Sequence, residues 1–219
     1  MSRFLKNIRS RHSHRQAGHP EYSRGMSYIE LIVVLSIFSA MSAIVLFNYS
    51  DFQTKVDIKN LASDIALKVV EGQKSSLSGK LPPLAQQVLT DSTWKPSYGV
   101  YINPTTDNKS FTYFVDLKNP VQNNFYDASI CPGSGECLDN ITITKGNYIS
   151  RLDVFYQGSP TPNPISDLTV SFVRPNSGAI IKSSTTFSSV VSFVQITITS
   201  PKLISSVIKI YPSGRIQVN

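Results

Sequence analysis

The stretch Gly25-Met26-Ser27-Tyr28-Ile29-Glu30, followed by the apolar run Leu31–Phe47, decides how this chain is organised. The run holds 17 residues without a charge, and serines are its only polar residues. That length is near the lower limit for a helix that crosses a bilayer, so we predict a transmembrane segment at 29–47. Because a charge inside lipid is costly, Glu30 at the start of this segment is a candidate functional residue.

Basic residues are concentrated before this segment. Six of the 21 lysines and arginines lie in residues 1–25, against one acid, Glu21. Residues 1–25 therefore carry five net positive charges, whereas the remaining 15 basic and 13 acidic side chains leave two. A basic flank before an apolar helix predicts a cytoplasmic leader and a domain outside the membrane. The near-neutral remainder argues against strong binding to nucleic-acid phosphates.

The sequence gives little sign of catalysis. All three histidines lie in the basic leader, where they could bind a metal but are more simply explained as polar filler. Without the leader, no histidine is left for a triad or a metal site, and no glycine loop precedes a helix as a nucleotide site requires. We therefore expect no enzyme activity, metal or cofactor. Acids that could still pair in space are scattered along the chain, at Asp116, Asp127, Glu136, Asp139 and Asp153.

The two cysteines, Cys131 and Cys137, flank a short loop that contains Pro132 and two glycines. Outside the cytoplasm this spacing favours a small disulfide, and two free thiols are the alternative. Two thiolates alone make a poor zinc site, so no metal is expected here.

The order of features around Gly25 resembles the N-terminal signal of type IV prepilins and pseudopilins. An ordinary secretory signal is cleaved after its apolar region, whereas here the small residue precedes it. The resemblance implies that a membrane-embedded prepilin peptidase cuts between Gly25 and Met26 and methylates Met26. Two positions depart from the usual pattern, because Met26 replaces the commoner Phe and Tyr28 stands where Thr is usual.

The resemblance also gives Glu30 a role. Cleavage creates an ammonium group at Met26, and in lipid each charge needs a partner. In that family the glutamate pairs with the N-terminal amine of a neighbouring subunit during assembly. The alternative is a glutamate that reaches the lipid head groups or stays protonated.

The helix is expected to continue beyond the apolar run. No proline or glycine interrupts Met26 to Glu71, and Gly72 with Ser75–Gly79 gives end signals, so the pattern predicts one helix from about 28 to about 77. Apolar residues recur three and four apart in its second half, which predicts an amphipathic face that packs on a sheet. The positions on that face are Ile58, Leu61, Ala62, Ile65, Ala66, Val69 and Val70.

After Pro83 the pattern changes to short runs of period two, separated by turn residues, which predicts an antiparallel sheet. The fold class is therefore α+β, with a leader at 1–25, a long helix within 26–78 and an extracytoplasmic β-rich domain at 79–219. The predicted strands are Tyr98–Ile102, Phe111–Leu117, Ile141–Thr144, Ile149–Tyr156, Leu168–Arg174, Ala179–Lys182, Val191–Thr199, Leu203–Tyr211 and Arg215–Val218.

A second, weaker resemblance lies near the end of the chain. The run Leu168–Phe172 with Gly178, and a closing hairpin that contains Gly214 and Arg215, is similar to the H-type (GspH/FimT-like) minor pseudopilins. Some FimT-like proteins bind DNA through basic residues near this Gly-Arg pair, which makes Arg215 a weak candidate for a DNA contact. A second arginine is missing here, and the alternative is that Gly214 serves the turn while Arg215 is a solvated strand residue.

Together these features predict a minor pilin or pseudopilin, anchored in a bacterial inner membrane and assembled into an extracytoplasmic filament. Its expected partners are prepilin peptidase, other pilin or pseudopilin subunits and membrane lipid. One alternative is a binding module at a filament tip for DNA uptake or adhesion. Another is a membrane-anchored enzyme with two acids of raised pKa in a cleft.

Overall fold

The computed structural model describes residues 25–90, 92–117, 121–127, 131 and 135–219, so the predicted leader up to residue 24 lies outside the described residues. The chain forms two compact units, one that ends at Leu46 and one that runs from Phe47 to Asn219. A long N-terminal helix and two antiparallel sheets confirm the predicted α+β class.

The helix α1 extends from Tyr28 to Leu77 and agrees with the predicted bounds. It ends in a Schellman motif: Gly79 has a φ of +70°, its N–H donates to the Ser76 carbonyl, and the Lys80 N–H donates to the Ser75 carbonyl. The glycine is required because side chains rarely adopt this left-handed backbone conformation.

In the first unit, the apolar side chains of α1 have nothing to pack against among the described residues. From Ile29 to Leu46 every isoleucine, leucine, valine, phenylalanine and methionine is 44–73% exposed. This helix segment is long and apolar enough to span a membrane.

In the second unit, one face of α1 is buried against the sheets. Five of the seven predicted positions are buried, while Leu61 is half-buried and Val70 is 42% exposed, so the buried stripe is narrower than predicted. The buried five are Ile58, Ala62, Ile65, Ala66 and Val69.

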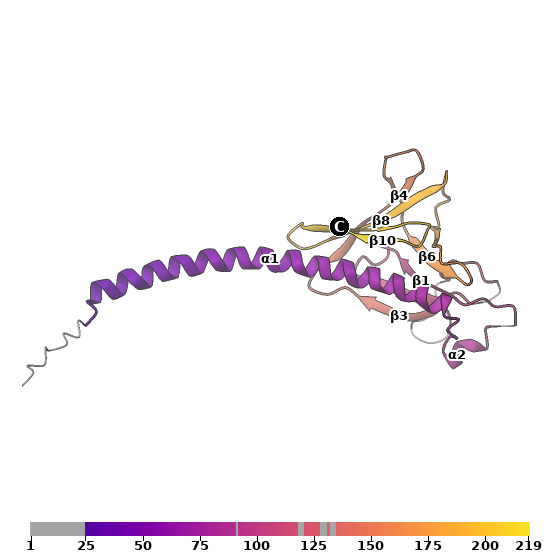
Figure 1. Cartoon of the computed structure of the whole chain (residues 1–219), viewed down its shortest axis with the longest axis horizontal. Coiled ribbons are helices and arrows are strands. Elements are labelled where there is room, and N and C mark those ends of the chain that lie inside the picture. The colour runs from indigo at the N-terminus through magenta and orange to yellow at the C-terminus, as the bar shows by residue number, and fades with distance from the viewer. Residues whose placement is uncertain (1–24, 91, 118–120, 128–130, 132–134) are drawn as a thin grey trace, which may run out of the picture. The chain divides into compact units, whose positions relative to one another are not determined.

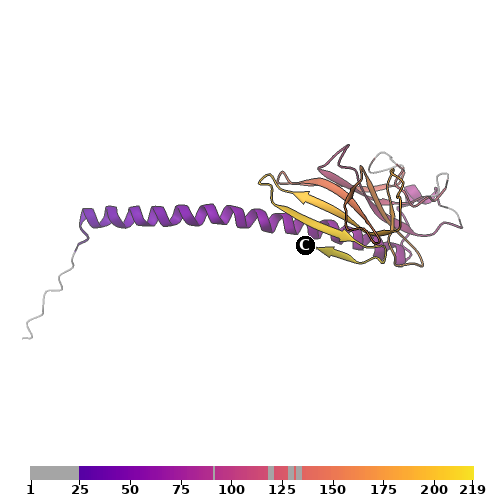
Figure 2. The same ribbon diagram turned by 90° about the horizontal axis from the view of Figure 1, so that it is seen from above.

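Each sheet has five strands, and all neighbours are antiparallel. The strands lie beside the second half of α1 (Figures 1 and 2). Sheet A has the order β3-β2-β1-β6-β7, with β1 Ser97–Ile102, β2 Ser110–Val115, β3 Cys137–Thr142, β6 Leu168–Val173 and β7 Ile180–Lys182. Sheet B has the order β10-β9-β8-β4-β5, with β4 Tyr148–Tyr156, β5 Asn163–Pro164, β8 Val191–Thr199, β9 Ser205–Ile210 and β10 Ile216–Val218.

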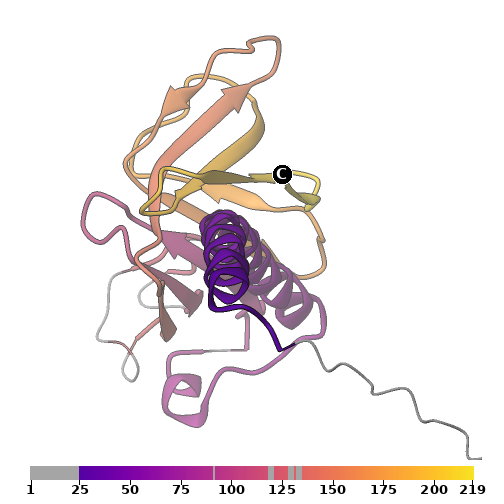
Figure 3. The same cartoon turned by 90° about the vertical axis from the view of Figure 1, so that its left-hand side faces the viewer.

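The main core forms where both sheets meet the second half of α1. In Figures 1 and 3 the strands of sheet B lie above this part of the helix, and β3 of sheet A lies below it. The inner face of β1 contributes Tyr98, Val100 and Ile102, each no more than 1% exposed. On the outer face of sheet A a second, smaller cluster joins Phe114, Tyr126 and Cys137, so this sheet is covered on both sides.

Some local predictions differ from the structure. Strand β3 begins at Cys137 rather than Ile141, because Cys137 pairs with Phe114 across a bulge in the register. Strand β9 begins at Ser205 rather than Leu203, because Leu203 has a φ of 61° and belongs to the preceding turn. The sequence pattern also missed the short helix α2, Leu84–Gln87, and the two-residue strand β5.

Candidate functional site

The predicted cleavage point lies in exposed, non-helical chain immediately before α1. Gly25, Met26 and Ser27 have no regular secondary structure, and the first helical hydrogen bond runs from the Leu31 N–H to the Ser27 carbonyl. Among the described residues, nothing lies within 4 Å of a Cβ atom built at Gly25. Gly25 and Met26 are thus exposed at the start of the described chain.

Glu30 lies in the first turn of α1 and is exposed. A carboxylate at this position interacts favourably with the unpaired N–H groups at the start of a helix. No lysine or arginine of the described residues forms an ion pair with Glu30. Glu30 is thus placed where it can accept a cationic partner from outside the described chain.

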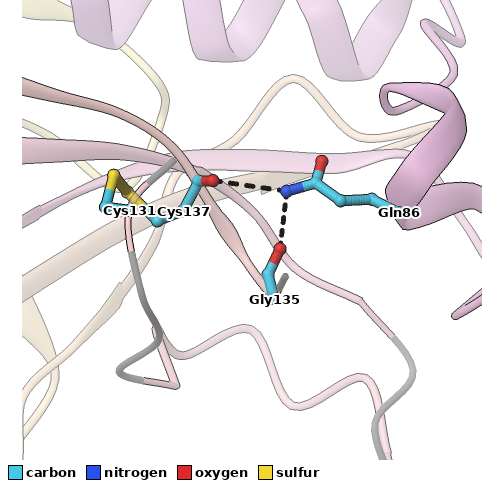
Figure 4. Close-up of a disulfide and its surroundings, with 4 residues drawn as sticks. All are labelled: Gln86, Cys131, Gly135 and Cys137. Carbon is cyan, nitrogen blue, oxygen red and sulfur yellow. Dashed lines mark hydrogen bonds between the residues drawn. A yellow bond between two sulfur atoms is a disulfide. The ribbon is translucent and has the colours of Figure 1, made fainter. Parts of the chain in front are cut away.

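The structure joins Cys131 and Cys137 in a disulfide, which ties the first residue of β3 to the preceding segment (Figure 4). Gln86 of α2 binds the backbone next to this disulfide. Its Nε2 donates to the Gly135 carbonyl at 2.6 Å and to the Cys137 carbonyl at 3.3 Å (Figure 4). Because Gln86 is only 3% exposed, these bonds anchor α2 to the edge of sheet A.

Two acids that are far apart in the sequence meet next to this disulfide. Asp116 is fully buried and Glu136 is 5% exposed. Burial raises the pKa of Asp116 to about 6 and that of Glu136 to about 7. The charge of Asp127 raises both pKa values, and the charge of Asp116 also raises that of Glu136. Sequence spacing gave no sign of this pair.

These carboxylates hold the chain that covers sheet A. Asp116 Oδ2 accepts from the Asn124 N–H at 2.7 Å. Glu136 accepts from the Leu117 N–H at 3.0 Å and from the Asp127 N–H at 2.7 Å. Both carboxylates are buried and bonded to backbone, so they stabilise this part of the fold.

The two elements that resemble H-type pseudopilins lie next to each other. Gly214 has a φ of +85°, and a side chain there would meet the Ser177 carbonyl at 2.3 Å. The Ala179 N–H donates to the Pro212 carbonyl at 2.9 Å, and Gln73 Nε2 of α1 donates to the Ser177 carbonyl at 2.7 Å. Gly214 therefore serves both a turn and a close contact between two loops and the helix.

Arg215 lies on an aromatic row that crosses the outer face of sheet B. Its guanidinium carbon is 3.9 Å from the centre of the Tyr211 ring. The Tyr211 ring lies 5.5 Å from that of Phe193, which stacks on Phe155 at 4.4 Å, and Lys209 Nζ is 5.1 Å from the centre of the Phe193 ring. Strand alternation could have revealed this row, because Phe155, Phe193 and Tyr211 all occupy outward positions of predicted strands.

No family model, curated protein or solved structure gave a significant match to this chain. The architecture itself is pilin-like, with one long N-terminal helix, apolar in its first part and packed on antiparallel sheets in its second.

Proposed function

We propose that this chain is a minor subunit, of the pilin or pseudopilin kind, of a type IV pilus or a type II secretion-like filament. The observation that carries the proposal is the apolar first part of α1, whose large side chains are all 44–73% exposed from Ile29 to Leu46. Such a surface is stable only in lipid or against other apolar helices. A subunit that moves from a membrane into a helical filament core needs both properties in the same segment.

The exposed Gly25–Met26 bond supports the first step of this function. Prepilin peptidase cuts this bond on the cytoplasmic side of the inner membrane and methylates Met26. The new amine lies about one helical turn from Glu30 in sequence. Glu30 then pairs with the amine of a neighbouring subunit, which sets the axial position of each new subunit, while the β-rich domain stays outside.

Replacement of Glu30 by alanine tests the assembly step. We expect Glu30→Ala protein to be cleaved normally but to enter sheared filaments at least tenfold less than the unaltered chain, because its neighbour's amine loses its partner. Glu71→Ala is the matched control, since it removes only the surface ion pair with Lys68 and stays near the unaltered level. Normal incorporation of Glu30→Ala protein would contradict the proposed pairing.

The aromatic row favours a second candidate function, a nucleic-acid contact at the filament tip. Aromatic side chains with nearby cations can stack bases and hold phosphates of single strands. We expect Lys209→Gln and Arg215→Gln to weaken the salt-sensitive binding of a single-stranded oligonucleotide severalfold each, and Lys109→Gln in an exposed turn to leave it unchanged. No binding by the unaltered chain at low salt would rule out this candidate.

A further inference from the structure

Residues 121–127 lie across the outer face of sheet A, and we call them the covering segment. Ser171 of β6 and Lys182 of β7 project from this face, because the strand register places them on the side that faces away from the main core. Ser171 Oγ donates to the Asn124 carbonyl at 3.3 Å, and Lys182 Nζ donates to the Asn123 carbonyl at 2.5 Å. Two neighbouring carbonyl groups of the covering segment are therefore bound to two strands of the sheet.

Asp116 approaches the same part of the covering segment from the end of β2. Its Oδ2 atom accepts from the Asn124 N–H at 2.7 Å. Its Oδ1 atom and the Oδ1 atom of Asn124 are both buried, and neither has a hydrogen-bond partner among the described residues. Two acceptor oxygens bond to each other only when one of them carries a proton. A proton on Asp116 would satisfy both atoms and would polarise the side-chain amide of Asn124.

Lys182 lies within reach of this amide. Its Nζ atom is 2.5 Å from the Asn123 carbonyl oxygen, and standard bond lengths keep Asn124 Cγ within about 5 Å of the same oxygen. Rotation about the flexible lysine side chain closes the remaining gap. Burial raises the pKa of Asp116 to about 6, and the nearby charge of Lys182 offsets part of the rise, so the ammonium and carboxyl groups also interact with each other.

We propose that Lys182 and Asn124 become joined by a covalent amide bond between Nζ and Cγ. Asp116 takes a proton from the lysine ammonium group, and the neutral amine attacks Cγ while Asp116 donates that proton to Oδ1. The Cγ–Nδ2 bond then breaks, and Nδ2 leaves as an ammonium ion with both protons that Nζ gives up. In total, one ammonium group and one primary amide become a secondary amide and an ammonium ion, so atoms and charge balance without a further reactant.

The fold supplies what this reaction needs. It holds the amine, the amide and the acid in one place, which replaces a bimolecular encounter by an intramolecular step. The product fastens β7, a three-residue edge strand of sheet A, to the covering segment. The disulfide fastens β3 at the opposite edge, so both edges of the sheet then carry a covalent link. The bond concerns the second unit alone and does not depend on the proposed filament role.

Intact-mass spectrometry of the full chain tests the bond directly. The chain is produced without prepilin peptidase, so that the leader stays, purified in detergent and treated with a reductant that opens the disulfide. We expect its mass to fall short of the mass calculated from the sequence by one ammonia. After trypsin digestion, the peptide that contains Asn124 should stay joined to the peptide that contains Lys182, and no cleavage should occur after Lys182.

Two matched variants remove the reacting groups and keep their surroundings. Lys182→Arg keeps the positive charge and a donor for the Asn123 carbonyl, but a guanidinium group that stays protonated does not attack an amide. Asn124→Gly accepts the φ of 59° at this position but has no side-chain amide. Both variants should show the full mass, with circular dichroism spectra like that of the unaltered chain.

The full mass in the unaltered chain overturns the proposal, and this result requires no variant to fold. A shortfall of one water instead of one ammonia would mean that a carboxyl group has reacted in place of Asn124. A shortfall that persists in Lys182→Arg would mean that Lys182 is not the nucleophile. Either of these results contradicts the assigned bond.

Asp116→Asn tests the proton transfer. The amide keeps an acceptor for the Asn124 N–H but cannot take up a proton, so formation of the link after synthesis should slow about a hundredfold. An unchanged rate would contradict the role of Asp116. Because this variant stays largely unlinked, its stability is compared with that of unaltered Asp116 on the Lys182→Arg background, in which neither chain is linked.

Discussion

Gly214 shows how one residue can hold three elements together. It lies in the turn before β10, against the loop that precedes β7, and next to Gln73 of α1. A built side chain would lie 2.3 Å from the Ser177 carbonyl and 2.6 Å from Gln73 Nε2, and the φ of +85° is itself strained for other residues. The turn and the packing therefore both require glycine.

We predict that Gly214→Ala lowers the free energy of unfolding by about 2–4 kcal/mol, because left-handed strain adds to a backbone clash. Gly158→Ala is the matched control, since Gly158 has a similar φ of +77° but nothing within 4 Å, and it should cost only about 1 kcal/mol. Denaturant unfolding of the two variants in detergent measures the difference. Equal costs would show that only the turn, and not the contact, needs glycine.

Asp116 and Glu136 make stability depend on pH. Their folded-state pKa values, raised to about 6 and about 7, exceed the ordinary values of 3.8 and 4.5, so the folded chain binds more protons. The contribution of these two groups to the free energy of unfolding must then fall as pH rises from about 4 to about 7 and stay level above that range.

Asp116→Asn should remove part of this slope and gain about 1–3 kcal/mol at pH 8, because the amide keeps an acceptor for the Asn124 N–H without the buried charge. Thermal unfolding at pH 4, 6 and 8 measures this effect. Asp107→Asn is a control with the opposite pH dependence. Hydrogen bonds in an exposed turn lower the pKa of Asp107, so its contribution to folding stability is present at neutral pH and is lost only as pH falls below about 4. An unchanged slope in Asp116→Asn would contradict the burial argument.

Among the elements, α1 combines two helical surfaces in one continuous helix. Its first part is apolar on all sides, whereas its second part buries only a narrow row of apolar side chains against the sheets. Ile65 is fully buried and Leu67, two residues later, is 65% exposed. Residues two apart lie on different sides of a helix, so the pair distinguishes the core from the outer surface.

We predict that Ile65→Ala costs about 2–5 kcal/mol of folding stability, because it leaves a cavity against the sheets. Leu67→Ala should change stability by less than about 0.5 kcal/mol. Denaturant unfolding followed by circular dichroism compares them. A large loss of stability in Leu67→Ala would mean that a different face of α1 packs against the sheets.

The same element shows why parts of the fold could be predicted from the sequence. Helix α1 follows from the absence of proline and glycine between Met26 and Glu71 and from the glycine after its end, and β8 follows from the alternation of apolar and polar residues from Val194 to Thr199; both are local patterns. The start of β3 depends on the pairing of Cys137 with Phe114, and α2 depends on the bonds of Gln86 to the carbonyls of Gly135 and Cys137. These contacts join distant parts of the chain, as does the pair Asp116 and Glu136, so no local pattern marks them.

At the scale of the whole molecule, the two units divide the work. The second unit holds the entire described core, the disulfide and the aromatic row, and it can present a stable surface outside a membrane. The first unit has an apolar helix that is exposed among the described residues and, at its start, the exposed residues Gly25, Met26 and Glu30. In the proposed function, the first unit carries the processing and assembly, and the second unit provides the filament surface.

Cleavage after Gly25 is the central claim, because the pairing of Glu30 and the release of the helix into a filament both depend on it. Mass spectrometry of the N-terminus, in cells with and without prepilin peptidase, tests it most directly. We predict a chain that starts at Met26 and carries one added methyl group when the peptidase is present, and an intact leader when it is absent. An intact leader in both cells, or a chain cut elsewhere, would contradict the account.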